Sequence, residues 1–250
     1  MNTNSIISSL PKYDDYIDCM VAFVDILGFD SIVRNIQSED DFNKISKLLY
    51  NLRETAKHFD AEDTLFHNLN VTAISDSIIL TMPVQDPISS PTTLAYLLHF
   101  IQYMLLESYG KLIRGYMTRG PVYHKEAIIF GKGYSEAVGK EKEIGHAPRI
   151  VVDPSLVKEA KTAILNAKKT FYDHILNFVM EDSCDGCYFF DYLKPVGIQA
   201  TIEKEQLVSQ REKIKIFIQN QLIAYRDNEK ILRKYNWLNN YFLLTKHYYE

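Results

Sequence analysis

The apolar positions of this 250-residue chain change their spacing several times, and each change indicates a predicted element. Met20–Phe29 is a continuous apolar run broken by one carboxylate, Asp25, and the chain turns at Gly28. Such a run, rich in β-branched residues and bounded by glycine, is typical of a strand buried on both faces. We therefore predict a first strand over residues 20–26.

Apolar side chains spaced three and four residues apart predict a series of helices. Asp30 and Ser38 stand where they would cap the first two of them. The expected helices cover residues 31–36, 38–56, 92–109, 134–144, 155–179 and much of 203–249.

Shorter apolar runs bounded by turn residues predict strands. They form hairpins over 70–82, hinged at Ser75–Asp76, and over 112–124 with 127–130, then a strand at 148–153 and two strands flanking Asp185–Gly186, with a loop at 83–91. Hairpins interleaved with covering helices indicate an α+β fold with a ferredoxin-like antiparallel sheet. We expect a lead-in over 1–19, one domain over 20–200, and a helical C-terminal extension over 201–250 that packs on the domain or on a second subunit.

Composition narrows the class of protein. With 46% hydrophobic residues the chain has enough apolar side chains for a sizeable core. A net charge of −4 and a pI of about 6.0 favour neither nucleic acid nor an anionic membrane. Three cysteines, an odd number, and a polar N-terminus without a secretory segment indicate reduced thiols and a cytoplasmic location. The Cys184 and Cys187 pair fits a hairpin turn better than a zinc site, which usually takes four ligands.

Two aspartates, Asp25 and Asp76, each follow an apolar strand. In a ferredoxin-like sheet the first strand lies beside the first hairpin, so the two carboxylates are expected to meet at one edge. Two unpaired carboxylates repel each other, and a divalent cation removes the conflict. Mg²⁺ suits such a site because it takes one or two carboxylates together with phosphate oxygens and water. The simpler alternative is that Asp25 caps the following turn and Asp76 begins a β-turn.

The motifs around these aspartates resemble the catalytic domain of class III nucleotidyl cyclases over residues 20–152. The resemblance is closest to the pyrimidine cyclases of bacterial Pycsar anti-phage systems. The matching segments are Phe23-Val-Asp-Ile-Leu-Gly-Phe29, Ser75-Asp-Ser-Ile-Ile79, Arg114-Gly, Gly120-Pro-Val-Tyr-His124, Ile129-Phe-Gly131 and Ala147-Pro-Arg-Ile-Val151.

The resemblance implies cyclisation of a pyrimidine nucleoside triphosphate with two Mg²⁺ or Mn²⁺ ions. It implies that Asp25 and Asp76 bridge both ions and that the backbone carbonyl of Ile26 is a further ligand. The backbone N–H groups of the turn Leu27, Gly28 and Phe29 would bind the phosphates. It also implies a homodimer with its sites at the interface.

The chain departs from the family pattern at the base site. Purine-specific members carry a Lys and an Asp where this chain has Thr72 and Ile128. Neither residue supplies the charged pair, which fits a pyrimidine, with Thr72 as a substrate contact.

A second departure concerns the ribose and the transition state. Ser135 and Gly139 align with an Asn that binds the ribose and an Arg that stabilises the transition state. Ser135 can still bind a ribose, whereas Gly139 supplies no cation. We expect Arg119 to replace that Arg across the subunit interface, with Lys140 near the substrate.

Four functions follow from these observations. The first is a uridylate cyclase that converts UTP to 3′,5′-cyclic UMP and pyrophosphate, a second messenger for anti-phage defence. The second is the corresponding cytidylate cyclase, acting on CTP. The third is a catalytically idle nucleotide-binding sensor, favoured by Gly139. The fourth is an interaction protein in which the aspartates are structural.

Overall fold

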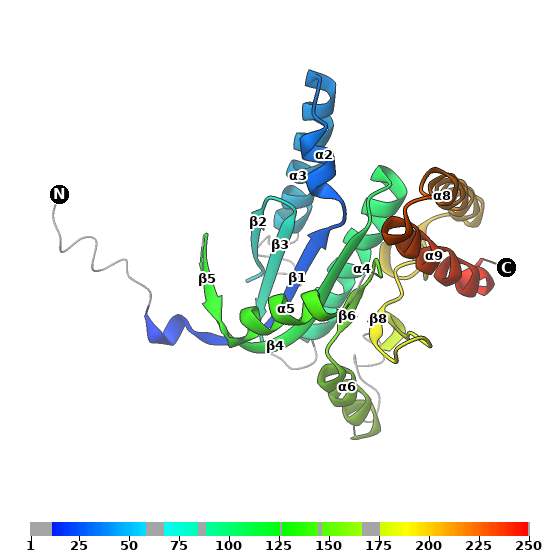
Figure 1. The fold of residues 1–250 in the computed structure, drawn as a ribbon. Helices are drawn as coiled ribbons and strands as arrows, with labels where there is room; N and C mark the ends of the chain where they lie inside the picture. Colours follow the sequence, from blue (N-terminus) through cyan, green and yellow to red (C-terminus); the bar gives the residue numbers. More distant parts are fainter. Residues whose placement is uncertain are drawn as a thin grey trace.

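The computed structural model describes residues 12–58, 68–84, 89–125, 127–144, 147–166 and 176–249. Within these ranges the strands form one sheet in the order β2-β3-β1-β4-β6-β8-β7, and β5 pairs with β4 (Figure 1). The strands are β1 (Ile17–Ile26), β2 (Asn70–Ile74), β3 (Ser77–Pro83), β4 (Ile113–Lys125), β5 (Ile128–Gly131), β6 (Ile150–Val152), β7 (Val179–Glu181) and β8 (Tyr188–Phe190). The central strand β1 is antiparallel to both β3 and β4, so β2-β3-β1-β4 has the predicted ferredoxin-like order.

Helices cover both faces of this sheet. They are α2 (Phe29–Arg34), α3 (Glu39–His58), α4 (Ser89–Tyr109), α5 (Lys132–Glu143), α6 (Pro154–Asn166), α8 (Lys204–Ala224) and α9 (Glu229–Leu244), with short 3₁₀ turns at Tyr13–Asp15, Gly197–Thr201 and Thr245–Tyr248. The predicted α+β class is therefore confirmed, as is the helical C-terminal region. No helix among the described residues is both long enough and apolar enough to cross a membrane.

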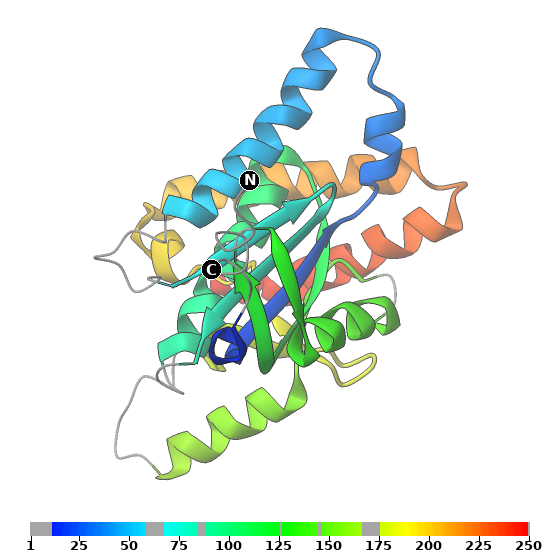
Figure 2. The same ribbon diagram turned by 90° about the vertical axis from the view of Figure 1, so that its left-hand side faces the viewer.

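Side chains of β1 alternate between two cores. Met20, Ala22, Val24 and Ile26 pack into the main core with apolar side chains of α3, α4 and α6. The intervening residues, from Cys19 to Phe23, belong to a smaller core that α5 completes with Ala137 and Tyr134. Figure 2 shows α5 beside the long strand β4. Asp25 continues this second series, so the sheet presents its carboxylate on the α5 face.

The C-terminal extension packs on the domain, which is one of the two predicted arrangements. Helices α8 and α9 lie side by side at the β8 end of the sheet (Figure 1). Together with Leu106 of α4 and Phe189 of β8 they enclose a third core, to which Ile218, Leu238 and other side chains of α8 and α9 contribute.

Several predicted boundaries differ from the observed ones. Strand β1 begins at Ile17 because Ile17 and Asp18 pair with the far end of β4. Helix α4 begins at Ser89, inside the predicted loop, and Pro91 is tolerated there because the first turn of a helix needs no N–H partner. The predicted helix over 155–179 is observed as α6 up to Asn166 and again at residues 176–177, shortly before β7 starts at Val179. Residues 167–175 of that prediction lie outside the described ranges.

The predicted caps had different outcomes. Ser38 does cap α3, because its hydroxyl accepts a hydrogen bond from the Asp41 N–H at 3.1 Å. Asp30 does not cap α2, which begins at Phe29 and leaves Asp30 to bind Arg34 at 2.8 Å. Cys19, Cys184 and Cys187 form no disulfide in the described residues.

Candidate active site

The end of β1 is joined to both neighbouring strands. The Ile26 N–H donates to the Asp76 carbonyl at 2.9 Å, and the Leu27 N–H donates to the Leu112 carbonyl at 2.8 Å. Gly28 then adopts a left-handed φ of 80°, which favours glycine, and starts α2. The hydrogen bond to Leu112 occupies the Leu27 N–H, so this predicted phosphate donor is not available. Gly28 and Phe29 remain as candidates in the turn.

Asp25 and Asp76 meet at this edge of the sheet, as the sequence predicts. Burial first, and then the negative charge of Asp76, raise the pKa of Asp25 from 3.8 to about 6. Arg114 acts in the opposite direction, and Glu141 adds to the increase. The pair therefore holds negative charge in a partly buried place, where the neighbouring chain only partly compensates it.

Arg114 stands opposite Asp25 in the β1–β4 ladder. Its Nη2 lies 3.6 Å from Asp25 Oδ2, and its Nε pairs with Glu141 Oε1 of α5. Glu141 is buried, with only 4% of its side chain exposed. The guanidinium is thus divided between two carboxylates.

Lys234 of α9 brings a second cation to the site from the C-terminal extension. Burial lowers the pKa of this ammonium, repulsion from Arg114 and Lys230 lowers it further, and attraction to Asp25 opposes the change. Neither Lys234 nor Glu141 was among the residues predicted from the sequence. The sequence could have indicated Glu141, because this residue continues, at a spacing of four, the buried face of α5 formed by Gly133 and Ala137.

Arg119 lies away from the two aspartates. It pairs with Met20 in the ladder, five positions beyond Arg114. An odd separation along a strand puts side chains on opposite faces, so Arg119 points to the face that α6 covers. There its Nη2 lies 2.7 Å from Asp18 Oδ2 and its Nη1 lies 3.5 Å from Glu159 Oε2. A role for Arg119 at the site of a second subunit stays a prediction.

Thr72, the predicted base contact, is buried and lies against His124 of β4. Its hydroxyl lies 2.7 Å from Nε2 of His124, whose Nδ1 lies 2.7 Å from the Thr81 hydroxyl. Burial lowers the pKa of His124 to about 4. Although His124 lies at the end of the predicted second hairpin, where an exposed side chain would be expected, it is buried.

The other predicted substrate contacts lie on the surface. Ser135 and Lys140 are exposed on α5, and Lys140 Nζ lies 2.8 Å from Glu143. Gly139 is also exposed, and a Cβ added there would meet nothing within 4 Å. Ile128 is half exposed on β5.

The donor set of the aspartate pair fits a divalent cation. No cluster of three or more His, Cys, Asp and Glu side chains suited to a metal occurs in the described ranges. Mg²⁺ needs only one or two carboxylates when water and phosphate oxygens complete its shell. Burial and the charge of Asp76 raise the pKa of Asp25 although Arg114 lowers it, so a further cation at the pair would favour the ionised carboxylate.

Comparison with known proteins gives remote structural similarity only. No family model and no curated protein matches the chain. The adenylyl cyclase CyaB from P. aeruginosa is 13% identical, with a TM-score of 0.44 over 69% of this chain and 93% of its own. The guanylate cyclase domain of RhGC from Catenaria anguillulae, solved with GTP, is 17% identical, with a TM-score of 0.46 over 70% of this chain and 96% of its own. Similarity this remote carries no inference about ligand or activity.

Proposed function

We propose that this chain is a metal-dependent nucleotidyl cyclase that converts UTP to 3′,5′-cyclic UMP and pyrophosphate. CTP is the alternative substrate. The observation that carries the proposal is the meeting of Asp25 and Asp76 at the edge of the sheet, where the charge of Asp76 contributes to the raised pKa of Asp25. A pair of carboxylates kept together at such a cost is typical of a metal-binding or catalytic site.

In this proposal Asp25, Asp76 and the Ile26 carbonyl hold two Mg²⁺ or Mn²⁺ ions. Bound there, the ions supply a lowered pKa for the ribose 3′-hydroxyl and positive charge for the departing pyrophosphate. The reaction joins the 3′ oxygen to the α-phosphorus, breaks the bond to the β-phosphate oxygen, and releases one proton.

The chain's own cations take the role of the missing helix Arg. Arg114 faces Asp25 at 3.6 Å, and the charge of Lys234 also interacts with Asp25. Positive groups fixed near a developing negative charge lower a barrier because they need not reorganise. Glu141 positions Arg114 by pairing with its Nε.

The choice of a pyrimidine rests on Thr72 and Ile128, which stand where the purine-specific pattern has charged residues. Assembly as a homodimer with sites at the interface, and a product that acts as a second messenger in anti-phage defence, belong to the same proposal. Ser135 on the exposed face of α5 is the proposed ribose contact across that interface.

The second candidate is a sensor that binds nucleotide and metal without turnover. The exposed Gly139, which offers no cation on α5, is the observation that favours it. The cations Arg114 and Lys234 favour the cyclase over the sensor, because a sensor has no transition state for them to stabilise.

Incubation with each of the four nucleoside triphosphates and Mn²⁺ or Mg²⁺ tests the proposal, with product identified by mass spectrometry. Cyclic UMP is the expected product, and it should disappear in Asp25→Asn and in Asp76→Asn. The exposed Asp30→Asn is the matched control and should keep full activity. Metal-dependent nucleotide binding without product would select the sensor, and no metal-dependent binding would reject both.

A further inference from the structure

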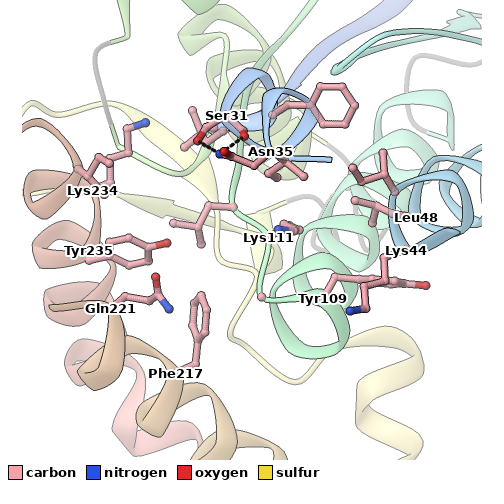
Figure 3. Close-up of a pocket in the computed structure, with 18 of the residues that line it drawn as sticks. Ser31, Asn35, Lys44, Leu48, Tyr109, Lys111, Phe217, Gln221, Lys234 and Tyr235 are labelled. Carbon is pink, nitrogen blue, oxygen red and sulfur yellow. Dashed lines mark hydrogen bonds between the residues drawn. The ribbon is translucent and has the colours of Figure 1, made fainter. Parts of the chain in front are cut away.

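A cavity of about 880 Å³ lies between the domain and its C-terminal extension. One wall is formed by α2, α3 and the end of α4, and the opposite wall by α8 and α9 (Figure 3). Its volume lies within the range of small-molecule sites in proteins. The turn at Leu27–Phe29, which leads away from Asp25, also borders it.

Two ammonium groups in this cavity form no ion pair within the described part of the chain. Among the described residues no carboxylate forms an ion pair with Lys111, and burial lowers the pKa of its half-buried ammonium. Lys234 is repelled by Arg114 and Lys230 and attracted by Asp25. A partly buried cation without a counter-ion is costly, so an anion bound between these two residues would be stabilised.

The other charged residues of the lining already have partners. Lys44 Nζ lies 2.5 Å from Asp40 on the same helix. Asp41 accepts a hydrogen bond from the Ser38 hydroxyl at 2.7 Å at the start of α3. The charge left for a ligand is therefore positive, and it comes from Lys111 and Lys234.

Aromatic rings lie beside these cations. Phe217 of α8 and Tyr235 of α9 line the same wall as Lys234, with ring centroids 6.0 Å apart at an interplanar angle of 71° (Figure 3). Gln221 stands between them in that view and offers both a donor and an acceptor. A flat, polar ring would find both an aromatic surface and hydrogen-bond partners there.

We infer that this cavity is a second binding site, and that it takes a nucleoside phosphate without a metal ion. Lys111 and Lys234 bind the phosphate, and Phe217, Gln221 and Tyr235 contact the base. The site adjoins the aspartate pair through Lys234 and the turn at Leu27–Phe29, and it depends on the C-terminal extension for one whole wall. Its occupant is either the substrate nucleotide at a second position or a different nucleotide that acts as an effector.

Calorimetric titration of the full chain in EDTA tests this inference, because EDTA removes metal-dependent binding at the aspartate pair. The probes are the 5′-mono- and triphosphates of all four ribonucleosides, and inorganic phosphate. We expect at least one nucleotide to bind with one site per chain. Lys111→Gln should weaken that binding at least tenfold, Tyr235→Leu should weaken it as well, and the exposed Lys213→Gln is the matched control that should not change it.

The outcomes separate this site from the proposed cyclase activity. Binding of UTP or CTP alone identifies the substrate, and binding of another nucleotide identifies an effector. Absence of any nucleotide binding in EDTA, or unchanged affinity in a folded Lys111→Gln variant, would overturn the inference. So would loss of binding in Asp25→Asn without loss in Lys111→Gln, or inorganic phosphate binding as tightly as any nucleotide. None of these results depends on whether cyclic product forms with Mn²⁺.

Discussion

Asp25 and Arg114 face each other across the β1–β4 ladder, with 3.6 Å between the guanidinium Nη2 and the carboxylate Oδ2. The same guanidinium pairs through Nε with the buried Glu141. This division leaves Asp25 only partly compensated, and its pKa is raised to about 6 in spite of the neighbouring cation. Further positive charge at the aspartate pair would therefore be stabilising.

Arg114 and Arg119 form a matched pair for testing which cation serves the reaction. Arg114→Ala should lower the rate of cyclic product formation by about 100-fold, the scale of losing one fixed positive group near a transition state. Arg119→Ala should change it only a few-fold, because Arg119 is bound to Asp18 on the opposite face. Steady-state rates of both variants, with circular dichroism as a folding check, measure the difference. An equal loss in Arg119→Ala would instead support its action across a subunit interface.

Asp25→Asn should stabilise the metal-free protein. The folded pKa of Asp25 is raised from 3.8 to about 6, so the folded state holds this proton more tightly than the unfolded state does. Stability from this group is therefore present at low pH and is lost as the pH rises from about 4 to 6. The variant should gain about 1–3 kcal/mol at pH 8 and little at pH 4.

Urea unfolding in EDTA at both pH values measures this gain, with Asp30→Asn as the control for an exposed aspartate. A variant less stable than the natural chain at pH 8 would show that the carboxylate of Asp25 stabilises the fold. In that case the aspartate pair would be structural.

Most of the sheet and the meeting of the aspartates could be predicted from the sequence, because both depend on local patterns. Apolar runs locate the strands, and Ser75–Asp76 at a hairpin hinge brings Asp76 to the end of the neighbouring strand. The face on which Arg119 lies also follows from a local pattern, since its odd separation from Arg114 along β4 puts the two side chains on opposite faces. The position of Lys234 could not be predicted from the sequence, because it depends on how two C-terminal helices pack on a distant part of the chain.

Gly139 and Gly133 occupy one helix, α5, and predict opposite effects of the same substitution. Gly139→Ala should stabilise the protein by up to about 1 kcal/mol, because alanine has the higher helix propensity and its Cβ would meet nothing within 4 Å. Gly133→Ala should destabilise it, because the new Cβ would lie 3.0 Å from the Gly120 carbonyl oxygen and 3.0 Å from Val21 Cγ2. Thermal melting of both variants makes the comparison. The same sign in both would contradict the close packing of α5 on β4.

His124 makes the stability of the folded protein depend on pH in the acid range. Burial lowers its folded pKa from 6.5 to about 4, so the unfolded state binds the proton first as the pH falls. Stability from this group is complete above pH 6.5 and is lost towards pH 4, by about 3 kcal/mol. His124→Gln should remove that part of the slope, whereas the exposed His247→Gln should keep it. Denaturant midpoints between pH 4 and 8 give the slope, and an unchanged slope in His124→Gln would disprove the assignment.

Arg149 joins the sheet to the C-terminal extension and is only 1% exposed. Its guanidinium pairs with Asp182 and Asp185, and Trp237 Nε1 of α9 donates to Asp182 Oδ2 at 2.7 Å. Arg149→Ala leaves the buried carboxylate of Asp182 without its cation, so it should cost about 3–5 kcal/mol of unfolding free energy. The exposed pair of Arg233 with Glu229 is the control, and Arg233→Ala should have little effect.

Trp237 is the single tryptophan of the chain, so its fluorescence reports the docking of α9 directly. In Arg149→Ala the fluorescence transition should occur at lower urea than the loss of helix and sheet signal measured by circular dichroism, because Asp182, which accepts the hydrogen bond from Trp237 of α9, loses the cation paired with it. In Arg233→Ala the two transitions should coincide. If both variants unfold at the same urea concentration, the apolar contacts of α8 and α9 alone hold the extension. The ion pairs of Arg149 with Asp182 and Asp185 would then add no stability beyond offsetting the cost of burying their own charges.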